Sequence, residues 1–182
     1  MESWDLVDET GHFLRTARAD SALKKDEYHF AVEIWPVNGK GEILVQKRSE
    51  FCKVLPGVWG LTTGRVQAGE TTVQGAVREL REELGLCTSP KSLIFLKRIV
   101  RRDGTQLIWD VFSMKTDVDI SDLLLQREEV EEVRWLPPEE MILMAEKGIL
   151  YCYPEFYEML KKAAGSVKEK AIKKVNQKKK RY

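Results

Sequence analysis

The sequence has few of the residues on which several classes of protein depend. Its 182 residues include two histidines and three cysteines, Cys52, Cys87 and Cys152, with no close paired spacing. This excludes a multi-histidine metal centre and argues against a disulfide framework or a zinc site, so we expect reduced thiols. No apolar run approaches the roughly 20 residues that span a bilayer. The acidic start also lacks a signal-peptide pattern, so we expect a cytoplasmic protein without membrane contact.

Charge is nearly balanced over the whole chain but unevenly distributed. Hydrophobic residues make up 43% and charged residues 32%, as in ordinary globular domains, and the formal net charge is +1. From Lys161 onward nine lysines and one arginine stand against one glutamate. We therefore expect one acidic domain over residues 1–164 and a disordered basic tail over residues 165–182. The tail has no interleaved aromatic residues, which favours a solubility role over nucleic-acid binding.

The rest of the chain alternates between strand-like and helix-like segments. Residues 4–16 read as an N-terminal hairpin. Strands are expected at residues 28–37, 42–48, 93–100, 106–114 and 130–136, and late helices at residues 139–147 and 154–164. Strands before and after one central helix, with helices at the end, predict an α/β fold. We expect an α/β/α sandwich around a mixed β-sheet, with its core at about residues 28–160.

The strongest pattern lies at residues 64–86, which read GRVQAGETTVQGAVRELREELGL. Thr71 and Gln74 have the spacing of a capping box, which predicts a helix start, and Gly85 predicts a left-handed helix end. Between them the apolar residues recur at helical spacing and predict one buried stripe: Val73, Val77, Leu80 and Leu84.

Three glutamates of this helix, Glu79, Glu82 and Glu83, lie together on a face turned away from the stripe. Carboxylates at these spacings repel one another, and a cation relieves the repulsion. Ligands that are all oxygen suit Mg²⁺ or Mn²⁺. A solvated acidic face is the alternative, but it leaves the spacing of Gly64 and Glu70 unexplained. Gly75 lies on the carboxylate side, where it provides either room for a metal or loop, or tight packing.

The stretch matches the Nudix box at every defined position, and the chain resembles the Nudix hydrolases. The matching residues are Gly64, Glu70, Arg78, Glu79, Leu80, Glu82, Glu83, Gly85 and Leu86. The resemblance implies metal-dependent attack on a diphosphate, with Glu79 and Glu83 as primary metal ligands and Glu82 as the third. It adds a backbone carbonyl at Thr63 or Gly64. It also implies structural roles for Gly64, Gly85 and a Glu70–Arg78 pair.

The sequence does not identify the residue that acts as general base. In Nudix enzymes the base is a glutamate of the box or one from a later loop. A cluster of later glutamates stands before the strand expected at residues 130–136: Glu128, Glu129, Glu131 and Glu132. Most of them are expected to be surface charges.

Residues 4–136 are also similar to the isopentenyl diphosphate isomerase branch of the superfamily. Arg48 and Lys53 stand in a segment that resembles the one that holds the diphosphate in that branch, with the lysine one residue later than usual. His29 stands where the isomerases place a metal-binding histidine, but without its partners it is expected to be a hydrogen-bonded core residue. The segment at residues 61–63 has no catalytic cysteine, and the box is intact. Both departures favour hydrolysis over isomerisation.

We therefore predict a cytoplasmic, Mg²⁺- or Mn²⁺-dependent hydrolase that cleaves a P–O–P linkage. Its substrate is expected to be a nucleoside diphosphate derivative or a small organic or prenyl diphosphate. The alternatives are an isopentenyl diphosphate isomerase and a non-catalytic Nudix module that binds a partner. The sequence does not identify the physiological substrate or the number of metal ions, and it leaves open whether the protein forms a homodimer.

Overall fold

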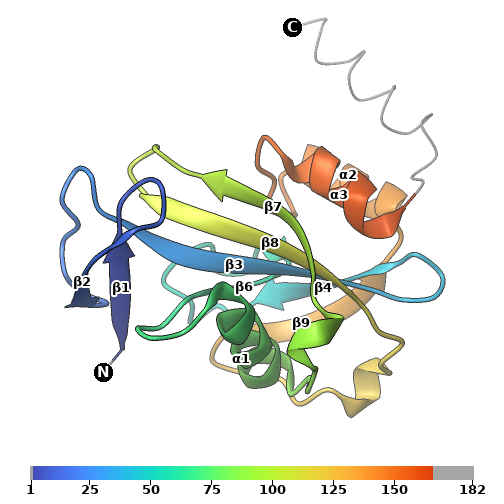
Figure 1. Ribbon diagram of the computed structural model, residues 1–182. Coiled ribbons are helices and arrows are strands. Elements are labelled where there is room, and N and C mark those ends of the chain that lie inside the picture. The colour runs from blue at the N-terminus through green and yellow to red at the C-terminus, as the bar shows by residue number, and fades with distance from the viewer. Residues whose placement is uncertain (1, 166–182) are drawn as a thin grey trace, which may run out of the picture.

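The computed structural model describes residues 2–165, which form a mixed α/β fold (Figure 1). The predicted basic tail, apart from Gly165, lies outside the described residues. The strands are β1 (Ser3–Val7), β2 (Phe13–Arg18), β3 (Tyr28–Val37), β4 (Ile43–Arg48), β5 (Trp59–Gly60), β6 (Thr62–Arg65), β7 (Ile94–Val100), β8 (Leu107–Lys115) and β9 (Val130–Leu136). The helices are α1 (Thr72–Leu84), α2 (Pro138–Glu146) and α3 (Phe156–Ala164), with short 3₁₀ turns η1 (Pro90–Ser92) and η2 (Ile120–Asp122).

Strand β3 is the centre of the sheet. Its sequence YHFAVEIWPV is almost entirely buried, as expected for a strand covered on both faces. One edge of β3 pairs in parallel with β8, from His29 opposite Leu107 to Val37 opposite Lys115. The other edge pairs with three strands in turn: β1, β6 and the start of β4. The sheet is therefore mixed, as predicted.

A smaller antiparallel group extends from the end of β3. Strand β4 pairs with β9 over most of its length and with β5 at Gln46 and Lys47. Strand β6 begins two residues after β5 ends and pairs with β3, not with β4. The chain therefore changes partner strands directly before residue 64, where the Nudix stretch begins.

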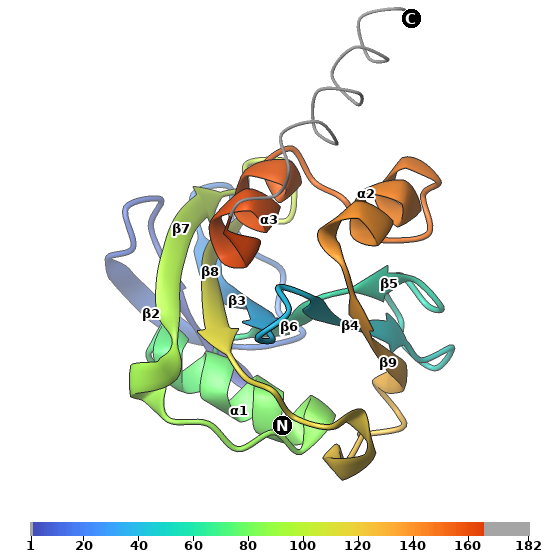
Figure 2. The ribbon, with the colours of Figure 1, turned by 90° about the vertical axis from the view of Figure 1, so that its right-hand side faces the viewer.

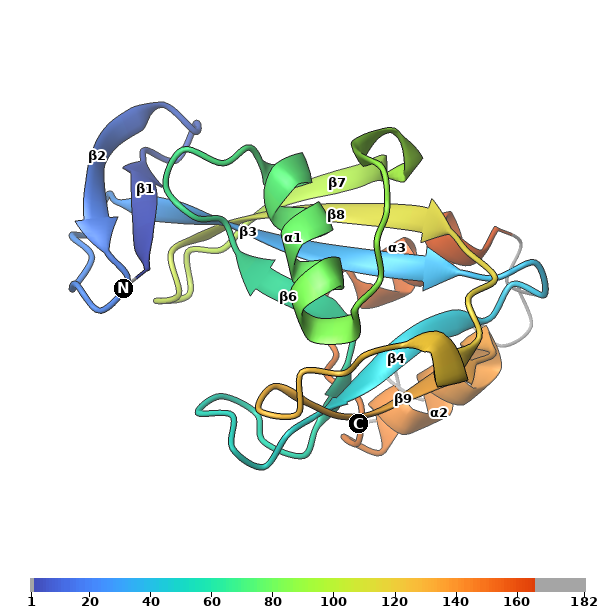
Figure 3. The ribbon, with the colours of Figure 1, turned by 90° about the horizontal axis from the view of Figure 1, so that it is seen from below.

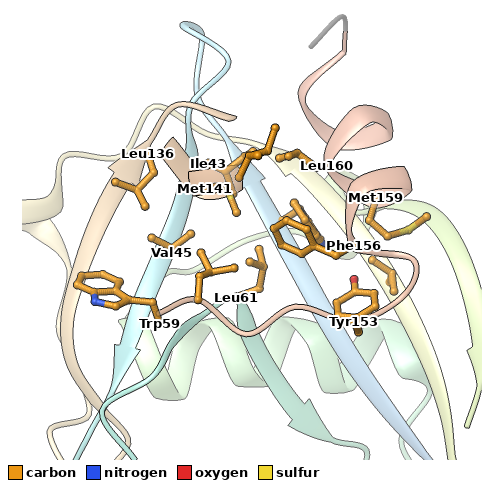
Figure 4. Packing of buried hydrophobic residues seen from close by; sticks show 14 of the residues in the cluster. Ile43, Val45, Trp59, Leu61, Leu136, Met141, Tyr153, Phe156, Met159 and Leu160 are labelled. Atoms are coloured by element: carbon orange, nitrogen blue, oxygen red, sulfur yellow. The ribbon is translucent and has the colours of Figure 1, made fainter. Parts of the chain in front are cut away.

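Helices cover both faces of the sheet, with α1 on one side and α2 and α3 on the other (Figure 2). The two faces follow from the alternation of side chains along β3. Val32 and Ile34 belong to the cluster beneath α1, whereas Ala31 and Trp35 belong to the opposite cluster. The latter is the larger core and includes Phe156 and other residues of the C-terminal helices (Figure 4). This arrangement is the predicted α/β/α sandwich.

The first two strands form an antiparallel hairpin at the start of β3 (Figure 3). Trp4 of β1 stacks on the ring of His29, with centroids 4.5 Å apart. The hairpin also contacts the loop before α1, because the amide of Ala68 donates to the carbonyl of Ser3 and that of Gly69 to the carboxylate of Asp5. The hairpin thus braces the loop that leads into α1.

Candidate active site

Helix α1 begins and ends where the sequence predicts. The Thr71 hydroxyl accepts a hydrogen bond from the amide of Gln74, and the Gln74 side chain accepts one from the amide of Thr71. At the other end Gly85 has φ +66°, and the amide of Leu86 donates to the carbonyl of Leu80. These local interactions fix the length of the helix and therefore the positions of its glutamates.

The glutamates of α1 differ sharply in exposure. Glu83 is 4% exposed, and the Glu79 side chain, one turn earlier, is 12% exposed. The Glu82 side chain is 43% exposed. The predicted acidic face therefore divides into an inward pair, Glu79 and Glu83, and an outward residue, Glu82. The apolar stripe is also shifted from the predicted one, because Ala76 is fully buried whereas Val77 is half-buried and lines an outer pocket.

Gly64 makes room for Glu79. Gly64 lies in β6 opposite Val32, and a Cβ atom built on it would lie 1.9 Å from Cδ of Glu79. Any larger residue would displace the carboxylate or the strand. The first glycine of the box is thus explained by contact with the first glutamate of the predicted metal site.

Arg78 binds three carboxylates of the box and a backbone carbonyl of β6. Its Nε and Nη2 donate to the two oxygens of Glu70 at 2.9 and 3.1 Å, which is the pair implied by the resemblance. Nη1 donates to Glu79 at 2.8 Å and to Glu82 at 3.0 Å, and Nη2 also reaches the carbonyl of Arg65. All five N–H donors of the guanidinium are in use. Arg78 therefore fixes the loop and orients Glu79.

Glu83 is held by a different group. The amide nitrogen of Gln46 donates to Oε2 of Glu83 at 2.8 Å, and the amide oxygen of Gln46 accepts from the Thr62 hydroxyl at 3.0 Å. Neither Gln46 nor Thr62 is among the site residues predicted from the sequence. The available signal was a polar residue two positions after Leu44, on the same face of an apolar strand.

The inward carboxyl pair is short of positive charge. Burial raises the pKa of Glu79 to about 7, against the lowering effect of Arg78. Burial also raises the pKa of Glu83 to about 8; the charges of Glu79 and Glu129 add to this rise, while Gln46 and Arg48 oppose it. Buried carboxylates that are not fully neutralised fit a hard divalent cation with oxygen ligands, so the residues present suit Mg²⁺ or Mn²⁺.

The three box glutamates do not converge on one point. Among residues 2–165, no group of three or more histidine, cysteine, aspartate or glutamate side chains stands close enough to hold a metal ion. The reason is that Arg78 holds Glu79 and Glu82, whereas Glu83 turns toward Gln46. The structure thus brings together Glu79 and Glu83 and leaves Glu82 at the edge.

The two predicted diphosphate-binding cations differ in their surroundings. Arg48 is largely buried: its Nε donates to the carbonyl of Val54 at 2.9 Å, and Nη2 lies 3.5 Å from Glu129. Its charge lowers the pKa of Glu83, so it acts electrostatically on the inward carboxyl pair. Lys53 is exposed on the loop between β4 and β5, and within the described part of the chain no ion pair involves it. The geometry therefore favours Arg48 over Lys53 as a phosphate ligand.

Of the four candidate bases, only Glu129 pairs with Arg48, and its charge acts on Glu83. Its Oε2 lies 3.3 Å from the thiol sulfur of Cys52 and 3.5 Å from Arg48. Glu131 pairs instead with Lys47 at 2.9 Å, Glu132 pairs with Arg134 at 2.6 Å, and Glu128 is exposed.

His29 and Gly75, which were both singled out in the sequence, are packed inside the fold. His29 is 2% exposed on the face of β3 turned away from α1, and burial lowers its pKa to about 4. It is a core residue as expected, but it is not hydrogen-bonded: within residues 2–165 neither ring nitrogen has a partner. Gly75 is packed closely, since a Cβ there would lie 3.2 Å from Val66. Packing therefore accounts for this glycine.

Comparison with known proteins agrees with this geometry. A family model described as the NUDIX domain matches residues 27–156. The chain is 32% identical over 150 residues to the uncharacterized Nudix hydrolase lmo0368 of Listeria monocytogenes, covering 81% of this chain and 87% of that protein. It is 34% identical over 140 residues to the uncharacterized Nudix hydrolase YfcD of Escherichia coli, covering 75% and 74%. The solved structure of DR0079 from Deinococcus radiodurans has a similar fold, with a TM-score of 0.71 at 22% identity over 89% of this chain and 99% of that one.

The chain belongs to the Nudix family and is a Nudix hydrolase, an enzyme of the pyrophosphohydrolase class. This membership agrees with the intact box at residues 64–86. Across residues 2–165, no helix combines the length and apolar character needed to cross a membrane.

Proposed function

We propose that this hydrolase uses Mg²⁺, or Mn²⁺, to cleave a P–O–P linkage in a nucleoside diphosphate derivative or a small organic diphosphate, prenyl diphosphates included. The observation that carries the proposal is the pair Glu79 and Glu83, one helical turn apart and both buried against the sheet. Burying two like charges side by side is costly unless a cation joins them. A role in binding a divalent ion explains why the chain keeps both.

Glu79 and Glu83 would hold the cation, together with the backbone carbonyl of Thr63 or Gly64. Gly64 supports this assignment because its missing side chain lets Glu79 approach β6. Glu82, whose Oε2 accepts from Arg78 as Oε1 of Glu79 does, would be the third ligand. A bound divalent cation supplies charge neutralisation on the diphosphate and lowers the pKa of water.

The protein side chains then have separate tasks. Arg48, whose charge acts on Glu83, would bind a phosphate oxygen of the substrate, with Lys53 as a weaker, exposed contact. Glu129 would accept a proton from the attacking water. The water oxygen forms a bond to phosphorus, the bridging P–O bond breaks, and the leaving phosphate keeps the bridging oxygen. Two phosphorylated products result.

The similarity to isopentenyl diphosphate isomerases remains a prediction about ancestry and substrate. Isomerisation would require an acid and a base on opposite faces of a carbon skeleton, without release of phosphate. The proposed test therefore detects isomers as well as cleavage products.

The test is a panel of nucleoside diphosphate derivatives, dinucleotides and prenyl diphosphates, incubated with Mg²⁺ and analysed by mass spectrometry after chromatographic separation. We expect cleavage of at least one class, abolished by EDTA. Glu83→Gln should lose most activity while remaining folded, and the exposed Glu128→Gln serves as a control. Full turnover by Glu83→Gln would refute the assignment of the metal site. An isomer without cleavage would replace hydrolysis by isomerisation.

A further inference from the structure

Gln46 is a buried polar residue on a strand that is otherwise apolar at its inward positions. It is 2% exposed and points, like Leu44, toward the face covered by α1. A buried amide that lacks hydrogen bonds costs stability, and an apolar residue would pack at this position without that cost. The presence of glutamine therefore calls for an explanation other than packing.

The hydrogen bonds of Gln46 form a linear relay of three buried side chains. The Thr62 hydroxyl donates to Oε1 of Gln46 at 3.0 Å, and Nε2 of Gln46 donates to Oε2 of Glu83 at 2.8 Å. Thr62 is 2% exposed and Glu83 4% exposed. As a metal ligand Glu83 is ionised and only accepts hydrogen bonds, so the amide turns its NH₂ group toward it. Its oxygen then faces Thr62, whose hydroxyl is able to donate.

Among residues 2–165, the Gln46 amide provides the only side-chain hydrogen bond to Glu83. The two nearby arginines bind other carboxylates: Arg78 holds Glu79 and Glu82, and Arg48 lies against Glu129. The two inward carboxylates are thus oriented by different groups, Glu79 by a guanidinium and Glu83 by a neutral amide.

The neutrality of Gln46 matters chemically. The next two residues of β4 are Lys47 and Arg48, which pair with carboxylates of other segments. A cationic side chain at position 46 would neutralise Glu83 and compete with a metal ion. An amide fixes the carboxylate without removing its charge and occupies only Oε2.

We propose that Gln46, itself oriented by Thr62, is a positioning residue that holds Oε2 of Glu83 and thereby presents Oε1 to the divalent cation. This inference rests on the proposed function, because it takes Glu83 as a metal ligand. Groups that hold a metal ligand in place typically contribute about 10–100-fold to metal affinity. Thr62 contributes indirectly, by preventing the amide from turning its oxygen toward the carboxylate.

The experiment measures Mn²⁺ affinity in the absence of substrate, from the electron paramagnetic resonance signal of free Mn²⁺. The proteins are the full chain, Gln46→Leu, Thr62→Val, Thr62→Ser, Glu83→Gln and the double variant Gln46→Leu/Thr62→Val. We expect Gln46→Leu to bind about 10–100-fold more weakly. Thr62→Val should weaken Mn²⁺ binding less than Gln46→Leu does. Thr62→Ser keeps the hydroxyl and should bind Mn²⁺ as tightly as the full chain. The double variant should bind no more weakly than Gln46→Leu alone, because Thr62 acts only through the amide.

The outcomes separate this inference from the proposed function. If the full chain binds Mn²⁺ and Glu83→Gln does not, unchanged binding by Gln46→Leu and Thr62→Val overturns the relay alone. Additive losses in the double variant also overturn it, because they would show that Thr62 acts independently. Equal binding by Glu83→Gln and the full chain overturns the proposed metal site itself. Should Gln46→Leu fail to fold, the Thr62 variants still test the relay. Thr62→Val keeps the volume of the side chain and removes the hydroxyl, whereas Thr62→Ser keeps the hydroxyl.

Discussion

The carboxylate of Glu79 occupies the space that a side chain at position 64 would need. A Cβ atom on Gly64 would lie 1.9 Å from Cδ and 2.1 Å from Oε1 of Glu79. Because Gly64 does not have a positive φ, its backbone would accept alanine, and the requirement for glycine is one of space. The first glycine and the first inward glutamate of the box therefore form one structural unit.

Gly64→Ala is expected to displace Glu79 and to lower kcat/KM by about 100-fold, the order of magnitude that a 1 Å misplacement costs. The overpacked core should also lose about 1–3 kcal/mol of unfolding free energy. Gly60→Ala on the neighbouring strand is the matched control, because the nearest atom to a Cβ there is 4.0 Å away, at Tyr151. Steady-state kinetics and urea unfolding on both variants give the comparison. Equal activity of the two variants would contradict the steric explanation.

Arg78→Ala is expected to destabilise the fold by about 3 kcal/mol, because Glu70 and Glu79 would lose their hydrogen-bonded cation in a largely buried site. Arg78→Lys should recover part of this loss, since an ammonium keeps the charge but cannot bind Glu70 in bidentate fashion. The comparison is made by urea unfolding against Arg81→Ala, an exposed arginine on the same helix. That control should change stability by no more than about 0.5 kcal/mol. Equal effects at the two positions would show that the Arg78 network is not structural.

Much of the secondary structure follows from local sequence. The run at residues 28–37 and the run at residues 130–136 are strands with those bounds, and the other predicted strands and late helices begin and end within two residues of their expected positions. Capping residues, turn glycines and the period of apolar residues act over a few positions, so they are readable without knowing the fold. The parallel pairing of β3 with β8 cannot be read from local sequence, because it joins segments about 80 residues apart.

The site was predictable only in part for the same reason. Helical periodicity places Glu79, Glu82 and Glu83 near one another, but it does not say which of them will face β4 and β6. Burial of Glu83 depends on Gln46, which is 37 residues away in the sequence. The family resemblance implies Glu70 and Arg78 as a pair, whereas Gln46 and Thr62 lie outside the Nudix box.

Glu33 is expected to make stability decline as pH rises. Burial raises its pKa to about 7, against the lowering effect of hydrogen bonds from Tyr153 and Trp35 and of the Arg101 charge. Below pH 4.5 the carboxyl is protonated in both states, whereas between 4.5 and 7 only the unfolded chain releases the proton. The stability that the protonated group contributes is therefore present at low pH and lost as pH rises through about 7.

Glu33→Gln removes this titration while keeping an acceptor oxygen for the two donors. The unfolding free energy of the unmodified chain, relative to Glu33→Gln, should fall by about 2–3 kcal/mol between pH 5 and pH 8. Urea unfolding at both pH values measures this difference, in which the other titrating groups cancel. A difference that does not change with pH would show that Glu33 has an ordinary pKa in the folded protein.

Glu129 is expected to act as the base in the cleavage step, because it alone among the later glutamates pairs with Arg48, and its charge acts on Glu83. Glu129→Gln should lower kcat by about 10²–10⁴-fold and change KM little, since a base acts on the transition state more than on binding. Glu131→Gln and Glu132→Gln, which remove carboxylates paired elsewhere, should leave kcat nearly unchanged. If Glu129 served only to hold Arg48, its loss would raise KM instead, as Arg48→Ala should. The division between kcat and KM in Glu129→Gln therefore decides between proton transfer and phosphate binding.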